Sequence, residues 1–359
     1  MIKKSAKDNK SFPKHVIFCF VDHFEPGNPY RDRPSKKALS LEEEIVRMDT
    51  WAKCFPEIAF KHKDSDGCFP KHGWFLPPHY DKADHLKRLV DLCKMGLGEV
   101  EMHLHHELMP PFPDTYETLK KKIEFCIESF SRYGVFVLAD GRRRYGFIHG
   151  NWALDNSLEA KLCGANYEIK ILAETGCFAD FSFPSLNKSQ PATVNKFYYV
   201  KDDTNKPKSY NYGKEVVVGG KPWGDLMLVQ GGIGLRWRGR SNKLIPSIDV
   251  GCLDGLNTPS LERMDYWVDN AITVKGRPDW LFVKVFCHGT IELNLDNMFG
   301  KFAEQMYSYL ETKYNDGKKY ALHYVSAREM YNLIKAAEAG LSGNPNQFRD
   351  FEIPKYVYL

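Results

Sequence analysis

The chain has 359 residues, of which 43% are hydrophobic and 27% are charged, as in an ordinary globular protein. This composition excludes a disordered, a collagen-like or a disulfide-scaffold protein. The net charge of +4 is spread thinly without a basic stripe, so no nucleic acid is expected as a partner. The longest apolar runs are strand-sized, far short of the ~20 residues that a membrane-spanning helix needs.

The N-terminus and the cysteines indicate the compartment. Met1–Ser5 leads into the polar segment 6–11 without the apolar core of an export signal. The nine cysteines are scattered singly and never form a CxxC pair, which is typical of reduced thiols. We therefore expect a cytoplasmic protein. The sequence leaves its oligomeric state open.

Strands and helices alternate along most of the chain. The expected strands are short runs rich in β-forming residues, and in chain order they cover 15–21, 74–76, 99–106, 135–138, 145–149, 177–183, 280–287 and 320–325. The expected helices have apolar positions at helical spacing, and they begin near 40, 84, 114, 167, 261, 299 and 327. The first of them begins with a capping box, Ser40 with Glu43. Repeated strand–helix units predict a parallel sheet, which is either open and doubly wound or closed into a barrel.

Residues 186–250 interrupt this rhythm with glycine pairs and short alternating segments. The strand–helix pattern resumes after them, so they are interpreted as a β-rich insertion in one domain that spans 1–359. The insertion could be a lid, a dimer contact or part of a barrel edge, and the sequence does not choose among these.

Histidines gather where the expected strands end. Seven of the twelve histidines occupy such positions: His23, His79, His103, His105, His106, His149 and His288. In parallel α/β folds the reactive groups lie at the carboxyl ends of the strands. Neutral imidazole suits zinc and similar transition metals. The pattern therefore predicts a metal site at one edge of the sheet.

The segment 103–107 carries the densest cluster of candidate ligands. Side chains alternate along a strand, so His103, His105 and Glu107 are expected on one face and His106 on the other. Two imidazoles at this spacing can share one metal ion, and tight binding needs a third ligand from another strand. The alternative is a strand that ends in surface histidines.

Other strand ends offer groups for acid–base chemistry and for substrate contact. Asp22 is a candidate general base or metal ligand, with a turn aspartate as the alternative. His288 is a candidate general acid, with a hydrogen-bonded core histidine as the alternative. The residues expected to contact a substrate are His79, His106, His149, Asn151 and Trp152. Trp152 would offer an aromatic platform for a sugar ring, or belong to the core.

These residues, in this order, resemble motifs of the polysaccharide deacetylase (NodB-homology) superfamily. Its first motif, Phe-Asp-Asp-Gly, corresponds to residues 20–23, where Asp22 takes the base position and His23 replaces a metal-binding aspartate. Its second motif, His-xxx-His, corresponds to His103 and Glu107, and its last to Val285–His288. The segment 172–180 looks like the helix that leads into an aspartate-bearing strand. The Arg-Pro-Tyr motif has no match, and 147–152 takes its place.

The resemblance implies a distorted (β/α)7–8 barrel with the β-rich insertion, on a bacterial branch of the superfamily. It implies a hydrolase that removes an N-acetyl group from a sugar or glycan intermediate. A divalent metal ion, expected to be zinc, would be held by His23, His103 and one of His105 or Glu107. Asp22 would take a proton from water and His288 would protonate the leaving amine. Trp223 or Trp237 could also line the cleft.

Two other readings use the same strand ends. A related barrel could hydrolyse a non-sugar C–N bond, or a glycosidic bond between two carboxylates within ~10 Å of each other, for which Asp22 and Glu107 are the candidates. A different class is a catalytically degenerate barrel that binds carbohydrate without turnover, because two metal positions depart from the motif.

Overall fold

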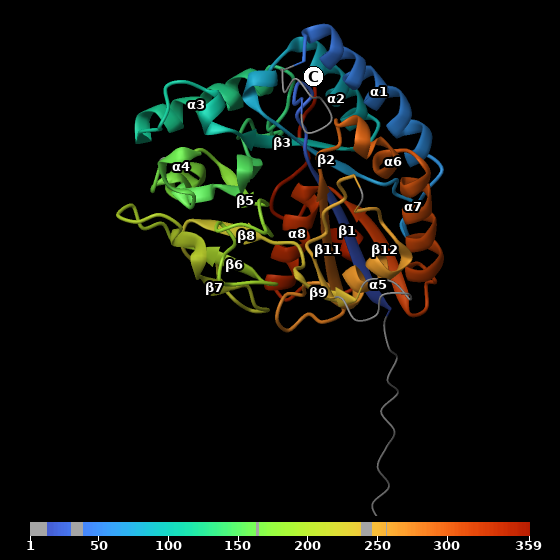
Figure 1. Cartoon of the computed structure of the whole chain (residues 1–359). Helices are drawn as coiled ribbons and strands as arrows, with labels where there is room; N and C mark the ends of the chain where they lie inside the picture. Colours follow the sequence, from blue (N-terminus) through green and yellow to red (C-terminus); the bar gives the residue numbers. More distant parts are fainter. Residues whose placement is uncertain (1–12, 30–38, 163–164, 238–245, 256) are drawn as a thin grey trace, which may run out of the picture.

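The computed structural model describes residues 13–29, 39–162, 165–237, 246–255 and 257–359. A large, mostly parallel sheet lies at the centre, with helices packed around it (Figure 1). The strands are β1 (Lys14–His23), β2 (His72–Leu76), β3 (Gly98–Leu104), β4 (Tyr145–His149), β5 (Cys177–Asp180), β6 (Phe197–Val200), β7 (Lys214–Glu215), β8 (Leu226–Val229), β9 (Gly234–Trp237), β10 (Pro246–Asp249), β11 (Trp280–Cys287) and β12 (Tyr320–Val325). The helices are α1 (Leu41–Ala59), α2 (Ala83–Lys94), α3 (Tyr116–Ser131), α4 (Glu168–Glu174), α5 (Leu261–Asp269), α6 (Leu295–Met298), α7 (Lys301–Tyr314) and α8 (Ala327–Glu338).

Strand β1 pairs with three other strands of the sheet, whose order is β11-β1-β2-β3-β4-β5-β8-β6-β7. One edge of β1 pairs with β11, and its other edge pairs first with β12 and then, from Phe20, with β2. All these pairings are parallel. Its side chains are buried except at Lys14, as its apolar sequence requires of a strand that is covered on both faces. The expected mixed α/β fold with a mainly parallel sheet is confirmed.

Strand pairing does not close this sheet into a ring within the described residues, where β11 and β7 form its two ends. A side chain bridges part of the opening instead. Lys284 of β11 is buried, and its Nζ donates to the carbonyl oxygens of Phe181 and, at 2.7 Å, Phe183, which follow β5. Burial lowers the pKa of Lys284 to about 7. The described residues therefore form a large, mostly parallel sheet with two ends and not the closed barrel that we expected.

Two smaller expectations also change. Residues 135–138 form turns and one isolated bridge, because Phe136 has a φ of 68°, outside the range of a strand. Within 186–250, β8 pairs with β5 and β6 pairs with β8, so these strands extend the main sheet. Among the described residues of this segment, only β9 and β10 form a separate two-stranded sheet. The capping box at Ser40 and Glu43 is confirmed.

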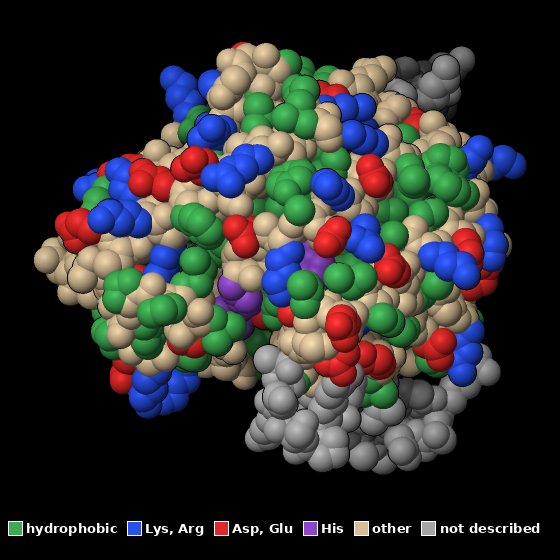
Figure 2. All heavy atoms as spheres, turned by 90° about the horizontal axis from the view of Figure 1, so that it is seen from above, with side chains coloured by type: hydrophobic (Ala, Val, Ile, Leu, Met, Phe, Trp, Pro, Cys, Tyr) green, Lys and Arg blue, Asp and Glu red, His purple; other side chains and the backbone are tan. Residues whose placement is uncertain are grey.

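The carboxyl ends of the central strands lie on one face of the molecule. In Figure 1 the chain enters at the foot of β1, which rises towards the top. Figure 2 looks down on that upper face and shows histidine side chains near its middle. Of the twelve histidines, only His79, His105 and His288 are partly exposed. In the part of the chain that the structure describes, no helix combines the length and hydrophobicity that crossing a lipid bilayer requires.

Candidate functional site

Three strand ends bring four histidine rings together below this face. His23 ends β1, His103 and His105 lie at the end of β3, and His288 follows β11. The ring of His23 lies 4.9 Å from that of His103 and 4.9 Å from that of His288, between ring centroids. The rings of His103 and His105 are 4.8 Å apart. The expected convergence of His23 and His103 is therefore present in the structure.

His103 has the geometry of a metal-ligating histidine. Its side chain is fully buried, and Nδ1 donates to the carbonyl oxygen of Ile148 at 2.8 Å. This bond fixes the proton on Nδ1, so the lone pair of Nε2 is free. Nε2 is buried and has no hydrogen-bond partner. Burial, followed by the charge of His105, lowers the pKa of His103 to about 3, so the ring is neutral at physiological pH.

His105 lies between two carboxylates. Its Nε2 is 3.1 Å from Oε1 of Glu25, and its Nδ1 is 3.1 Å from Oε1 of Glu107. Burial opposes a charge on this ring, but the two carboxylates outweigh it and raise the pKa of His105 to about 10. Asn151 donates to Oε1 of Glu107 at 2.8 Å. Gly150 permits the close packing, because a Cβ there would lie 2.5 Å from the ring of His105.

These groups can hold a cation. Nitrogen atoms of His103 and His105 and an oxygen of Glu25 lie within 4.8 Å of one another. Two imidazoles and a carboxylate are a common ligand set for zinc. The free Nε2 of His103 supplies one lone pair without loss of a proton, and His105 supplies another when the cation displaces its proton into solvent. The residues therefore fit a divalent transition metal.

His288 is oriented by an aspartate that the sequence analysis missed. Its Nδ1 lies 3.2 Å from Oδ2 of Asp254, and its backbone N–H donates to Oδ1 of the same residue at 3.0 Å. Burial lowers the pKa of His288, but the hydrogen bond and charge of Asp254, together with the charges of Glu25 and Asp22, raise it, and the net change is an increase. By contrast, burial and then the charges of His288 and His103 lower the pKa of His23 well below its ordinary value. The pair of His288 and Asp254 is therefore suited to donate a proton beside neutral rings.

A cavity of about 470 Å³ lies beside the histidine cluster. Trp152 and Phe286 connect the cavity with the histidine cluster. Both side chains line the cavity, and their ring centroids lie 5.5 Å and 6.0 Å from that of His23. The rest of the lining is mostly polar: Ser185, Leu186, Asn187, Arg236, Ser247, Ile248, Asp249, Val250, Cys252, Asn257 and Arg263. Trp152 thus lies between the histidine cluster and the cavity. Trp223 and Trp237 are 41% and 62% exposed and do not line this cavity.

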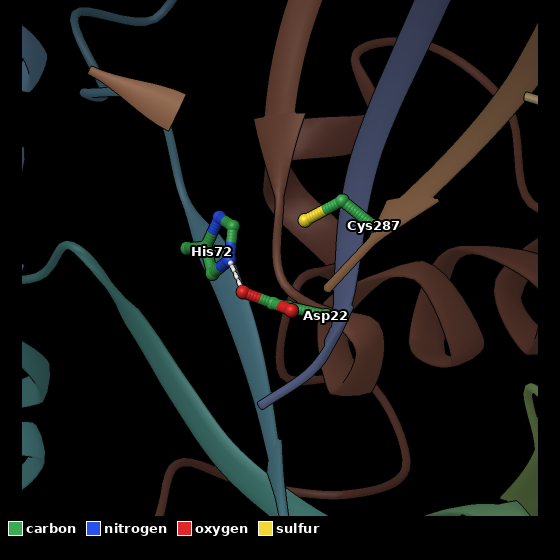
Figure 3. Close-up of side chains that lie close together, drawn as sticks. All are labelled: Asp22, His72 and Cys287. Carbon is green, nitrogen blue, oxygen red and sulfur yellow. Dashed lines mark hydrogen bonds and ion pairs between the residues drawn. The ribbon is translucent and has the colours of Figure 1, made fainter. Parts of the chain in front are cut away.

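Asp22 points away from the cluster. It is fully buried and accepts from His72 Nε2 at 2.8 Å and from the backbone N–H of Gly289 at 2.7 Å. Figure 3 shows its carboxylate directed towards His72, with the Cys287 side chain beside it. Alternation along β1 explains this, because neighbours on a strand face opposite sides. Both oxygens are bonded inside the protein, so the structure does not place Asp22 as a base that water could reach.

The other predicted contact residues divide into two groups. His79 is partly exposed and lies in a short 3-10 helix after β2. Burial lowers the pKa of His79 to about 4, and the negative charge of Glu25 opposes this shift. His106 and His149 are fully buried and stack on each other at 4.5 Å, so substrate contact is not consistent with their placement. His106 faces away from His105, as the expected alternation requires.

Comparisons with known proteins do not support the deacetylase resemblance. No family model matches the chain, and no curated protein matches it in sequence. Among solved structures, a GH57 branching enzyme from the hyperthermophilic archaeon Thermococcus kodakaraensis, in complex with glucose and additives, is similar with a TM-score of 0.38 and 9% identity. The match covers 86% of this chain and 72% of that one. Membership of the polysaccharide deacetylase superfamily is therefore wrong as an identification: short matches at strand ends are shared by many α/β folds with strand-end sites.

Two residues of the site were not among the predicted ones. Glu25 lies two positions after His23, the last residue of β1. Residues two positions apart on an extended chain face the same side, so this spacing was a signal that could have identified Glu25. Asp254 lies in the loop before α5, where no periodic pattern marks a position. Only the three-dimensional contact with His288 identifies it.

Proposed function

We propose that the chain is a metal-dependent hydrolase that acts on a carbohydrate. The observation that carries the proposal is the buried, unpartnered Nε2 of His103, held towards Glu25 and His105 by the bond from Nδ1 to Ile148. A buried nitrogen lone pair without a partner is costly unless a cation or a donor meets it. Zinc is the metal that this ligand set fits best.

Each side chain of the site has a separate role in this proposal. His103, His105 and Glu25 would hold the cation, with His23 beside them as a neutral ring. When bound, such an ion polarises a substrate oxygen and lowers the pKa of water towards ~7. His288 would donate a proton to the leaving group, and Asp254 would keep that proton-donating ring in place. Glu107 and Asn151 would fix the orientation of His105.

The cavity supports a sugar as the substrate. Trp152 and Phe286 present apolar ring surfaces, on which the C–H face of a sugar can pack. Asn187, Asn257 and Ser247 line the same cavity and offer hydrogen bonds to hydroxyl groups. The cavity volume of about 470 Å³ is that of a small-ligand site.

A glycosidic bond is a second candidate target, and it needs no metal. Glu25 and Glu107 flank His105 from opposite sides, and two carboxylates across a site are what glycoside hydrolysis requires. This pair replaces Asp22 and Glu107, because Asp22 is sealed inside the fold. The variant Glu107→Gln separates the candidates: it should abolish turnover by a carboxylate pair, but only weaken a metal-dependent reaction.

The test is a substrate panel with and without metal. The purified chain is stripped with a chelator, reloaded with zinc, and assayed on N-acetylated sugars, sugar esters and aryl glycosides. We expect turnover that disappears on chelation and returns with zinc. Turnover of glycosides that survives chelation would favour the second candidate. Sugar binding without turnover in either form would leave only a carbohydrate-binding protein.

Replacing Asp254 by asparagine should lower the pKa of His288, because the stabilising carboxylate charge is lost. The acidic form of His288 would then disappear at a lower pH than in the parent protein. Titration of the His288 ring by NMR measures this directly, and the alkaline limb of the rate profile should move the same way. An unchanged titration would show that Asp254 does not control the ring. Asp84→Asn, an exposed substitution on α2, is the matched control.

A further inference from the structure

A second group of buried side chains adjoins the site just described, and it involves none of that site's proposed ligands. His106 follows β3, His149 ends β4, and Glu168 begins α4. All three are fully buried. Nitrogen atoms of the two rings and an oxygen of Glu168 lie within 4.8 Å of one another. The group thus gathers three segments that are far apart in the sequence.

The outer nitrogen of each ring lies close to an oxygen atom of the protein. Nδ1 of His149 donates to the carbonyl oxygen of Gly150 at 2.6 Å. Nδ1 of His106 lies 2.8 Å from Oδ2 of Asp114, which also pairs with Lys122 at 2.7 Å. Carboxylates and carbonyls at this position are what orient the histidines of metal sites. His149 therefore has its proton drawn outward and its Nε2 directed inward. His106 lies between two carboxylates, because its Nε2 is also hydrogen-bonded to Oε1 of Glu168 at 2.9 Å.

The two Nε2 atoms converge on one carboxylate oxygen. Oε1 of Glu168 lies 2.9 Å from Nε2 of His106 and 3.5 Å from Nε2 of His149. Nε2 of His149 has no hydrogen-bond partner although it is buried. With its proton on Nδ1, this atom presents a lone pair to a negatively charged oxygen, and that contact is unfavourable in a dry interior. A cation between the three atoms would convert it into an attraction.

We propose that His106, His149 and Glu168 form a second, structural site for a divalent transition metal, with zinc as the fitting ion. Two imidazoles and a carboxylate match its preferences, and Asp114 and Gly150 supply the outer hydrogen bonds. Because the donors are completely buried, the ion would enter as the chain folds and would tie the ends of β3 and β4 to α4. This proposal goes beyond the hydrolase and does not depend on it.

The test counts zinc ions in the whole chain, refolded with zinc and then freed of excess. We expect two ions per chain in the parent protein, one in His149→Ala and one in His103→Ala. Glu168→Gln, which keeps the shape of the side chain, should also retain one, in case His149→Ala folds poorly. His85→Ala removes a buried histidine that lies outside both groups, and should retain two.

A second readout is stability. A site that exists only in the folded chain increases the folding equilibrium constant about 100-fold when free zinc is 100 times its dissociation constant. Zinc should therefore protect His103→Ala from urea, but should no longer protect the double variants that combine His103→Ala with His149→Ala or with Glu168→Gln.

The outcomes separate the two metal proposals. One ion that is lost in His103→Ala and kept in His149→Ala overturns the second site and leaves the hydrolase standing. One ion with the reverse dependence supports the second site and removes the metal from the hydrolase. No bound zinc at all contradicts both.

Discussion

Replacing His103 by alanine is expected to weaken zinc binding at the upper site by at least about 100-fold. Loss of a residue that merely orients a ligand costs 10–100-fold, so loss of a direct ligand should cost no less. The fold should persist, because the ring of His103 makes one hydrogen bond within the protein, to the backbone oxygen of Ile148. Competition with a chromogenic chelator measures the affinity, and hydrolysis should fall in parallel.

The matched control is His62→Gln. His62 is also buried, but it pairs with Glu304 and Glu311 at 3.5 Å and 3.1 Å, outside the cluster. Equal zinc affinity in His103→Ala and in the parent protein would eliminate the proposed metal centre. In that case the site would hold no metal, and the ring of His105 would stay paired with the carboxylates of Glu25 and Glu107.

Replacing Asp22 by alanine should lower the free energy of unfolding by about 3 kcal/mol. The substitution leaves Nε2 of His72 and the N–H of Gly289 without their acceptor in a fully buried place. It also opens a cavity next to the aromatic ring of Trp51, which packs against His72 at 4.7 Å. Urea unfolding measures the loss, and zinc binding to the folded variant should be unchanged.

The isosteric variant Asp22→Asn distinguishes a structural from a catalytic role. It keeps an acceptor for Gly289 and should lose much less stability than alanine does. If Asp22→Asn folds as stably as the parent protein but loses all turnover, Asp22 is the general base after all. If both variants keep turnover in proportion to the folded fraction, the role of Asp22 is to hold β1, β2 and the loop after β11 together.

The sequence allowed the sheet and the location of the site to be predicted, because both follow from local patterns. The run His15–Val21 could only be a buried strand, and strand ends had to collect polar groups on one face. Alternation also correctly separated His106 from His103 and His105. The positions of His23 and His103, 80 residues apart in the chain, needed only the assumption of parallel neighbours with β2 between them.

What the sequence could not supply were contacts between distant loops. Asp254 meets His288 across 34 residues, and nothing local marks either as a partner. The choice of Asp22 as the base had a different origin: the same alternation that was applied to β3 also applies to β1, where it puts Asp22 and His23 on opposite sides. Motif similarity led to the choice of Asp22 as the base, against that geometry.

Because His105 and His106 are consecutive residues, the upper cluster and the buried group below it take their ligands from opposite sides of one backbone segment. An insertion or deletion of a single residue within β3 would move the side chains of His105 and His106 to the opposite faces of the segment. Both groups of ligands would then be disrupted at once. Variation between relatives, and any attempt at redesign, should therefore alter this segment by substitution and never by a change of length. Adjustments in length belong in the loops beyond it.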